Sequence, residues 1–206
     1  MVKVSQAKLI AGAIAGEAIS FPTDTVPALA IKPKYGQRIY QLKQRPEYKP
    51  LILMGASIAD LLPFIIYTPE QLKAWQELTE KYWPGALTLV LPASQLVPAV
   101  INSNNSNTVG IRVPNHPLAL QILQQTGVLA TTSANISGTE ALTETDDIAK
   151  TFPEVLVLEP NNLEENSNLS SGLPSTVVGW ENNQWQVFRQ GSIKIASNFN
   201  TTHNLY

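Results

Sequence analysis

Hydrophobic and polar positions alternate along this chain with two periods, one typical of helices and one typical of strands. The helical period predicts helices over residues 5–17, 35–43, 57–66, 68–82, 118–125 and 143–152. Short apolar or alternating runs predict strands over 18–21, 28–31, 51–54, 87–91, 108–113, 128–133, 155–158, 175–180 and 184–188. Helices and strands thus follow one another throughout, which predicts a single α/β domain with a mixed sheet.

Two local signals place the ends of these elements. Thr68 followed by Pro69 is a good start for the helix over 68–82, because threonine caps a helix and proline suits its first position. The residues Glu181-Asn182-Asn183 lie between the last two predicted strands and indicate a hairpin.

Composition places the chain among globular proteins. Its 206 residues are 44% hydrophobic, enough for one large core. There is no cysteine, which excludes disulfides, thiolate metal sites and a cysteine nucleophile. No signal peptide or apolar run long enough to cross a membrane is evident, so we expect a cytoplasmic protein without a membrane partner. We expect one catalytic domain over 1–196 and a flexible tail over 197–206, while the polar loop over 161–172 leaves open whether it acts as a lid.

A basic segment stands out in a chain whose formal net charge is −2. Lys43, Arg45 and Lys49 lie close together in a loop that Pro46 and Pro50 stiffen. Arginine offers a fork of donors and lysine a compact point charge, a combination that suits phosphate or carboxylate. The alternative is a solvated basic loop at a helix C-terminus, where cations favour the helix dipole.

Polar groups also fall at strand ends and turns. Thr23 and Thr25 lie in a proline-bounded turn, where they either cap the turn or present hydroxyls to a ligand. Arg112 lies within an apolar strand, which is costly unless the arginine is paired or faces a site. Strand alternation places Thr131 and Ser133 on one face.

The chemistry of this inventory is narrowed by exclusion. The two histidines, His116 and His203, do not have metal-ligand spacing, and there is no G-x-S-x-G elbow, Walker loop or Rossmann fingerprint. What remains is a set of cations with hydroxyl and amide groups, which can hold anionic reactants and stabilise developing charge. Phosphoryl or nucleotidyl transfer works in this way, usually with Mg²⁺.

Seven short motifs occur in order between residues 5 and 193. They are Phe21-Pro22-Thr23-Asp24-Thr25-Val26, Lys43-Gln44-Arg45-Pro46 with Lys49-Pro50-Leu51, Trp83-Pro84-Gly85 with Leu87-Thr88-Leu89, Gly110-Ile111-Arg112-Val113-Pro114, Thr132-Ser133-Ala134-Asn135-Ile136-Ser137-Gly138, Pro174-Ser175-Thr176-Val177-Val178 and Arg189-Gln190-Gly191. Together they resemble the YrdC-type threonylcarbamoyl-AMP synthase family, in its short, single-domain form.

The resemblance implies a twisted mixed parallel/antiparallel sheet flanked by helices, with a concave, positively charged face. It implies a nucleotidyltransferase that joins L-threonine, bicarbonate and ATP into L-threonylcarbamoyl-AMP and releases pyrophosphate, with Mg²⁺ carried by the nucleotide. Downstream threonylcarbamoyl-transferase proteins would then modify tRNA.

The resemblance also implies which residues form the site. The family's Lys-x-Arg and Ser-x-Asn signature falls on Lys43, Arg45, Ser133 and Asn135, which are expected to be catalytic. The same four residues, with Lys49 and Arg189, are expected to bind ATP. Residues expected to bind L-threonine are Thr23, Thr25, Arg112, Thr131 and Ser175. No direct protein ligand to a metal is expected.

One departure concerns the substrate. The family usually has Tyr-Gly where this chain has Pro27-Ala28, which removes a ring and a hydroxyl from the expected amino-acid side of the pocket. A paralogue that adenylates another carbamate is therefore an alternative. A non-catalytic module that binds double-stranded RNA or tRNA through the same basic face is another, although the negative net charge counts against it.

Overall fold

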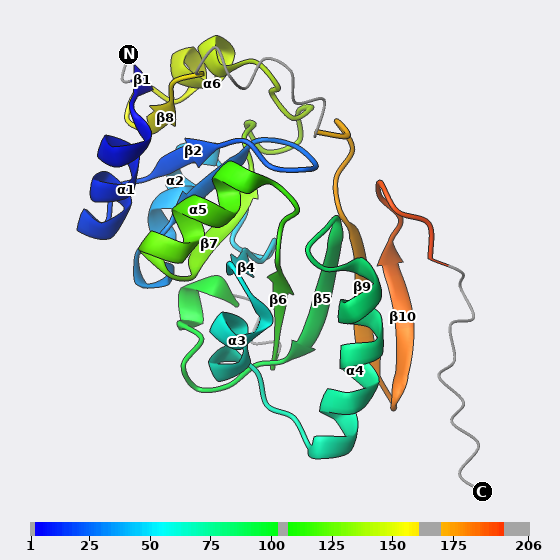
Figure 1. Ribbon diagram of the computed structural model, residues 1–206. Helices are drawn as coiled ribbons and strands as arrows, with labels where there is room; N and C mark the ends of the chain where they lie inside the picture. Colours follow the sequence, from blue (N-terminus) through cyan, green and yellow to red (C-terminus); the bar gives the residue numbers. More distant parts are fainter. Residues whose placement is uncertain (1–2, 103–106, 161–169, 196–206) are drawn as a thin grey trace, which may run out of the picture.

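The computed structural model describes residues 3–102, 107–160 and 170–195. Within them, ten strands form one mixed sheet in the order β1-β8-β2-β3-β7-β4-β6-β5-β9-β10 (Figure 1). The strands are β1 (Lys3–Val4), β2 (Ile19–Phe21), β3 (Ala28–Ile31), β4 (Ile52–Met54), β5 (Leu87–Pro92), β6 (Thr108–Arg112), β7 (Leu129–Ser133), β8 (Leu156–Leu158), β9 (Thr176–Glu181) and β10 (Gln184–Arg189). Five pairings are antiparallel, namely β2–β3, β3–β7, β7–β4, β6–β5 and β9–β10, and the other four are parallel.

Six α-helices and three 3₁₀-helices connect these strands in the described residues. The α-helices are α1 (Gln6–Ala15), α2 (Gln37–Lys43), α3 (Ile58–Leu61), α4 (Pro69–Tyr82), α5 (Pro117–Thr126) and α6 (Thr145–Thr151). The 3₁₀-helices are η1 (Pro33–Tyr35), η2 (Leu62–Phe64) and η3 (Ala99–Ile101). Helix α4 begins as expected: Thr68 caps it through the Gln71 amide, and Pro69 occupies its first turn.

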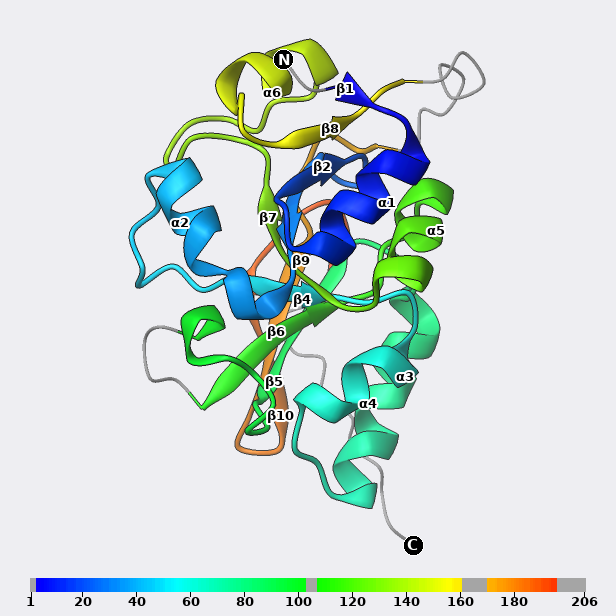
Figure 2. The ribbon, with the colours of Figure 1, turned by 90° about the vertical axis from the view of Figure 1, so that its left-hand side faces the viewer.

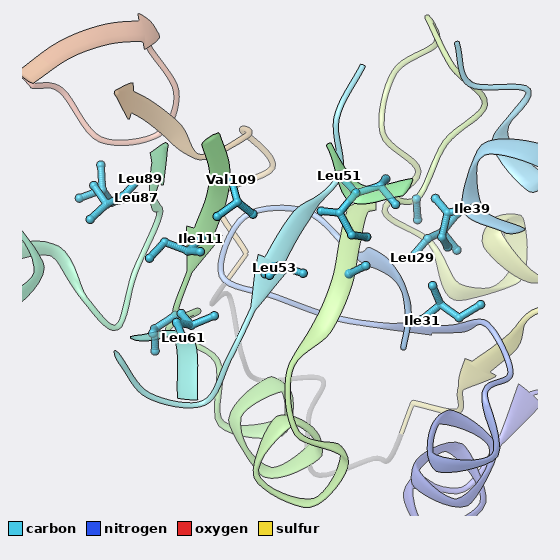
Figure 3. Close-up of a cluster of buried hydrophobic side chains, with 14 of the residues drawn as sticks. Leu29, Ile31, Ile39, Leu51, Leu53, Leu61, Leu87, Leu89, Val109 and Ile111 are labelled. Atoms are coloured by element: carbon cyan, nitrogen blue, oxygen red, sulfur yellow. The ribbon is translucent and has the colours of Figure 1, made fainter. Parts of the chain in front are cut away.

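The larger hydrophobic core lies on one face of the sheet. Leu29, Leu53 and Ile111 point into it from three strands, where they meet Ile39 of α2 and Leu61 of α3 (Figure 3). Trp75 of α4 and Phe152, directly after α6, belong to the same core. This face is therefore closed to solvent by helices.

The opposite face is covered only in part. Helices α1 and α5 lie side by side and pack on it near β2, β3 and β8 (Figure 2). Ala30, Thr131, Ile52, Gly110 and Val90 are successive register partners on five neighbouring strands, so their side chains share this face. Gly110 leaves space on this face, because a Cβ on it would lie 2.8 Å from Ile52 Cγ2.

Most predicted elements are confirmed with small shifts at their ends, as is the mixed sheet of a single α/β domain. The helix predicted over 57–66 is wrong in its second half: Pro63 lacks an N–H, the chain tightens into η2, and Ile65 is extended. The short elements β1 and η3 are too brief to leave a periodic signal. The predicted tail over 197–206 and residues 161–169 of the predicted loop lie outside the described residues.

Candidate active site

A cavity of about 440 Å³ lies on the partly open face of the sheet, a volume suited to a small ligand. Nine residues expected at the site line it: Thr23, Thr25, Arg45, Lys49, Arg112, Thr131, Ser133, Ser175 and Arg189. The lining includes four cations and no carboxylate. Two expected residues, Lys43 and Asn135, are not part of the lining.

The turn between β2 and β3 supplies two buried hydroxyls. Thr23 Oγ1 donates to the Val26 carbonyl at 2.7 Å and accepts from the Thr25 amide at 3.2 Å. The two threonine hydroxyls lie 3.0 Å apart. These residues therefore stabilise the turn, as the first interpretation expects, and they also line the cavity. That they present hydroxyls to a ligand stays a prediction.

Arg112 is buried beside this turn and forms hydrogen bonds with it. Its guanidinium donates to Asp24 Oδ1 at 2.7 Å, to Thr25 Oγ1 at 2.8 Å and to the Gly85 carbonyl at 3.1 Å. Burial lowers the Arg112 pKa, and the charge of Asp24 opposes that shift. The need for a partner was visible in the sequence, but the identity of that partner, Asp24, was not.

The basic loop after α2 is shaped by its own arginine. Gln44 ends the helix in the left-handed conformation, with φ +50°. Arg45 then donates from Nε to the Lys49 carbonyl and from Nη2 to the Pro50 carbonyl, both at 3.0 Å. Burial lowers the Arg45 pKa. Arg45 thus folds the loop so that Lys49 also borders the cavity.

The far wall of the cavity comes from β5, β9 and β10. Ser175 Oγ lies 2.8 Å from Thr88 Oγ1, and Arg189 Nη2 donates to the Ser175 carbonyl at 2.9 Å. Gly191 allows this close approach, because a Cβ there would lie 2.1 Å from the Pro174 carbonyl oxygen. Thr88 is a site residue that sequence reasoning missed; its only signal is a hydroxyl between two buried leucines of a strand.

Thr131 presents a polar atom without a partner. Its Oγ1 is buried, and no described residue forms a hydrogen bond with it. An unsatisfied buried hydroxyl costs about 1–3 kcal/mol, which a ligand or water in the cavity can recover. Thr131 therefore contributes an unpartnered polar atom to the cavity lining.

Lys43 reaches the end of β7 from α2, which packs in the larger core. Its side chain is completely buried, with Nζ donating to Thr132 Oγ1 at 3.3 Å, to Asn135 Oδ1 at 3.0 Å and to the Ser133 carbonyl. Burial, and then the charge of Arg45, lowers the Lys43 pKa to about 7. No carboxylate of the described residues forms an ion pair with it.

Comparison with known proteins identifies the relatives of this site. A family model described as telomere recombination, for the Sua5/YciO/YrdC proteins, matches residues 14–191. The chain belongs to the Sua5/YciO/YrdC family. Its expected membership of a YrdC-type family is thereby confirmed.

Several organisms contain relatives of this chain that are named threonylcarbamoyl-AMP synthase. The protein from Bacillus subtilis is 39% identical over 139 residues, which are 65% of this chain and 39% of that protein. The protein from Hydrogenovibrio crunogenus is 34% identical over 155 residues, 71% of this chain and 80% of that protein. The chain thus spans about two fifths of the first relative and about four fifths of the second.

Solved structures agree with the fold. Sua5 of Pyrococcus abyssi complexed with L-threonine is 30% identical and has a TM-score of 0.78, covering 92% of this chain and 55% of that one. YciO of Escherichia coli has a TM-score of 0.76 and covers 94% of this chain and 93% of that one. At 21% identity, YciO supports the fold alone.

Pro27 and Ala28, which replace the Tyr-Gly of the Sua5/YciO/YrdC family, line two different cavities. Ala28 lines the main cavity, whereas Pro27 lines a second one of about 220 Å³ with Phe21 and His116. Pro27 itself therefore does not line the main cavity, and the effect of the missing tyrosine on substrate choice stays a prediction.

No described helix is long and apolar enough to cross a membrane. Within the described ranges there is also no cluster of three or more histidine, cysteine or acidic side chains suited to a metal ion.

Proposed function

We propose that this protein is an L-threonylcarbamoyladenylate synthase, which forms threonylcarbamoyl-AMP and pyrophosphate from L-threonine, bicarbonate and ATP. The observation that carries the proposal is the main cavity: four cations and eight serine or threonine residues line one space without a carboxylate, in a chain related to threonylcarbamoyl-AMP synthases. Such a lining attracts reactants that carry phosphate and carboxylate groups.

The phosphates of ATP are assigned to Arg45, Lys49 and Arg189. The Lys49 main-chain carbonyl accepts a hydrogen bond from Arg45 Nε, and Lys49 lines the cavity, so its side chain can contact a phosphate. Arg189 lies at the wall opposite Arg45 and Lys49, where its Nη2 donates to the Ser175 carbonyl. Cations on two sides of the cavity stabilise the charge that develops as the α-phosphate is attacked by the carbamate oxygen.

L-threonine is assigned to the end of the cavity near the threonine turn. Arg112 has five N–H groups, of which three donate to described residues, which leaves two for a carboxylate. The hydroxyls of Thr23, Thr25, Thr131 and Ser175 surround the same region. The unpartnered Thr131 Oγ1 is the natural contact for a polar group of the amino acid.

Mg²⁺ enters this proposal as part of the nucleotide substrate. The described lining has no carboxylate to ligate the ion, and Mg²⁺ readily binds through phosphate oxygens and water. We further assign the protein to the cytoplasm, where its product would pass to proteins that modify tRNA.

The test is pyrophosphate release from MgATP and bicarbonate, measured with L-threonine, with L-serine, with other amino acids and without any amino acid. Threonine-dependent release and a product with the mass of threonylcarbamoyl-AMP are expected. Release with another amine would instead indicate a paralogue with a different substrate. No release, together with salt-sensitive RNA binding, would favour the RNA-binding module.

Site variants sharpen this test. Lys49→Ala should raise the KM for ATP by about tenfold, the effect of losing one hydrogen bond to a charged group. Lys73→Ala is a matched control, because Lys73 is exposed on α4 and does not line the cavity. Equal kinetics for the two variants would contradict the assigned phosphate contact.

A further inference from the structure

The side-chain amide of Asn135 has a fixed orientation. Its Nδ2 donates to the Ile136 carbonyl at 2.9 Å and to the Thr139 carbonyl at 2.7 Å, which are both acceptors. Only the nitrogen can make these two bonds, so Oδ1 must point toward Ser133 and Lys43. Asn135 is buried, with 7% of its surface exposed, and this arrangement leaves its amide fully bonded.

Two donors converge on that oxygen. Ser133 Oγ donates to Asn135 Oδ1 at 2.6 Å, and Lys43 Nζ donates to the same atom at 3.0 Å. Ser133 has a single hydroxyl hydrogen, which this bond uses. The hydroxyl therefore turns its lone pairs, and not its hydrogen, toward the cavity that it lines.

Lys43 has no hydrogen left for a ligand. An ammonium group carries three, and its three acceptors here are Thr132 Oγ1, the Ser133 carbonyl and Asn135 Oδ1. Its complete burial and its absence from the cavity lining agree with this count. Contact with a phosphate would require Lys43 to break bonds in a buried site.

We propose that Ser133 is a specificity-determining hydrogen-bond acceptor, held in that state by Lys43 and Asn135 as positioning residues. This inference rests on the proposed function and departs from the expectation that Lys43 binds the triphosphate. The group that Ser133 receives must be a donor: an O–H of the nucleotide, or the N–H or O–H of the amino acid. Phosphate oxygens are excluded because they are acceptors at neutral pH.

Calorimetry of separate ligands tests the proposal. The probes are inorganic triphosphate, which offers only acceptors, MgATP, 2′-deoxy-ATP, 3′-deoxy-ATP and L-threonine. Ser133→Ala should lower the affinity for either ATP or L-threonine by about three- to tenfold, which is the effect of losing one neutral hydrogen bond. The affinity for triphosphate should stay unchanged. If ATP is affected, the deoxy-nucleotide that lacks the donor should bind both proteins equally, and Ser133→Thr should restore ATP binding.

Lys43→Met keeps the length of the side chain and removes the ammonium. It should reproduce the ligand pattern of Ser133→Ala, and the double variant should lose no more than either single one, because both act through one contact. Circular dichroism confirms that each variant is folded, and Lys49→Ala, which should weaken triphosphate binding, is the contrasting control. Loss of triphosphate affinity in Lys43→Met or Ser133→Ala, or additive losses in the double variant, would overturn the inference.

The same experiment separates this inference from the proposed function. A wild-type protein that binds neither ATP nor L-threonine would overturn both. Normal binding and turnover by the wild type, with triphosphate affinity lost in Ser133→Ala, would overturn only the role of Ser133.

Discussion

Removing the carboxylate of Asp24 should destabilise the folded protein by several kcal/mol. The side chains of Arg112 and Asp24 are only 5% and 10% exposed, and their ion pair is 2.7 Å long. Asp24→Ala leaves the arginine charge buried with its carboxylate partner gone, which costs about 3–5 kcal/mol. For a chain of this size that loss corresponds to a fall in Tm of about 6–20 °C.

The molecule contains a matched control for this change. Arg38 and Glu154 form an ion pair of 2.9 Å, but their side chains are 48% and 67% exposed. Glu154→Ala should therefore cost about 0–1 kcal/mol, since water solvates the arginine that remains. Urea and thermal unfolding of both variants, without ligand, measure the difference.

A double variant identifies the cause. Asp24→Ala combined with Arg112→Met removes both charges, so its loss of stability should be smaller than the sum of the two single losses. Strictly additive losses, or equal Tm shifts for Asp24→Ala and Glu154→Ala, would refute the reasoning from burial.

Two further predictions concern Lys43 and Pro27. Burial lowers the Lys43 pKa from 10.5 to about 7, so between these values the unfolded chain holds a proton that the folded chain has released. The free energy of unfolding therefore rises with pH, by about 2 kcal/mol from pH 7 to 9 for this group. Urea unfolding at both pH values should show a smaller rise for Lys43→Met than for the wild type. Parallel pH dependences would contradict the shift. Pro27 lines the second cavity, so in Pro27→Tyr the preference for L-threonine over L-serine in pyrophosphate release should stay unchanged; an altered ratio would place residue 27 at the main site.

Most helices and strands could be predicted from the sequence, because they are long relative to the period of their hydrophobic pattern. Helix α4 has both a capping box and an apolar stripe, and strands such as β3 are continuous apolar runs. Element β1 has two residues, which is shorter than any pattern can register. The order of strands depends on long-range packing, which no local signal records.

The residue types of the candidate site could be predicted from the sequence better than the positions of their side chains. Thr131 and Ser133 were placed on one face by strand alternation alone, and both line the cavity. Lys43 and Arg45 stood together in sequence, but the left-handed Gln44 between them sends one side chain into the protein and leaves the other at the cavity. A single backbone angle of this kind cannot be read from residue types.

The pairing of β9 with β5 has a consequence for how the protein acquires activity. Leu87 of β5 is the register partner of Thr176 of β9, so the last hairpin docks on a strand formed much earlier in the chain. Ser175 and Arg189 enter the cavity only when this late segment is in place. Because Ser175 and Arg189 follow most of the sheet in the sequence, the cavity stays incomplete until this hairpin has been synthesised and has paired with β5. By the same linkage, a ligand that touches Ser175 and Arg189 would hold the hairpin closed and protect it against proteolysis.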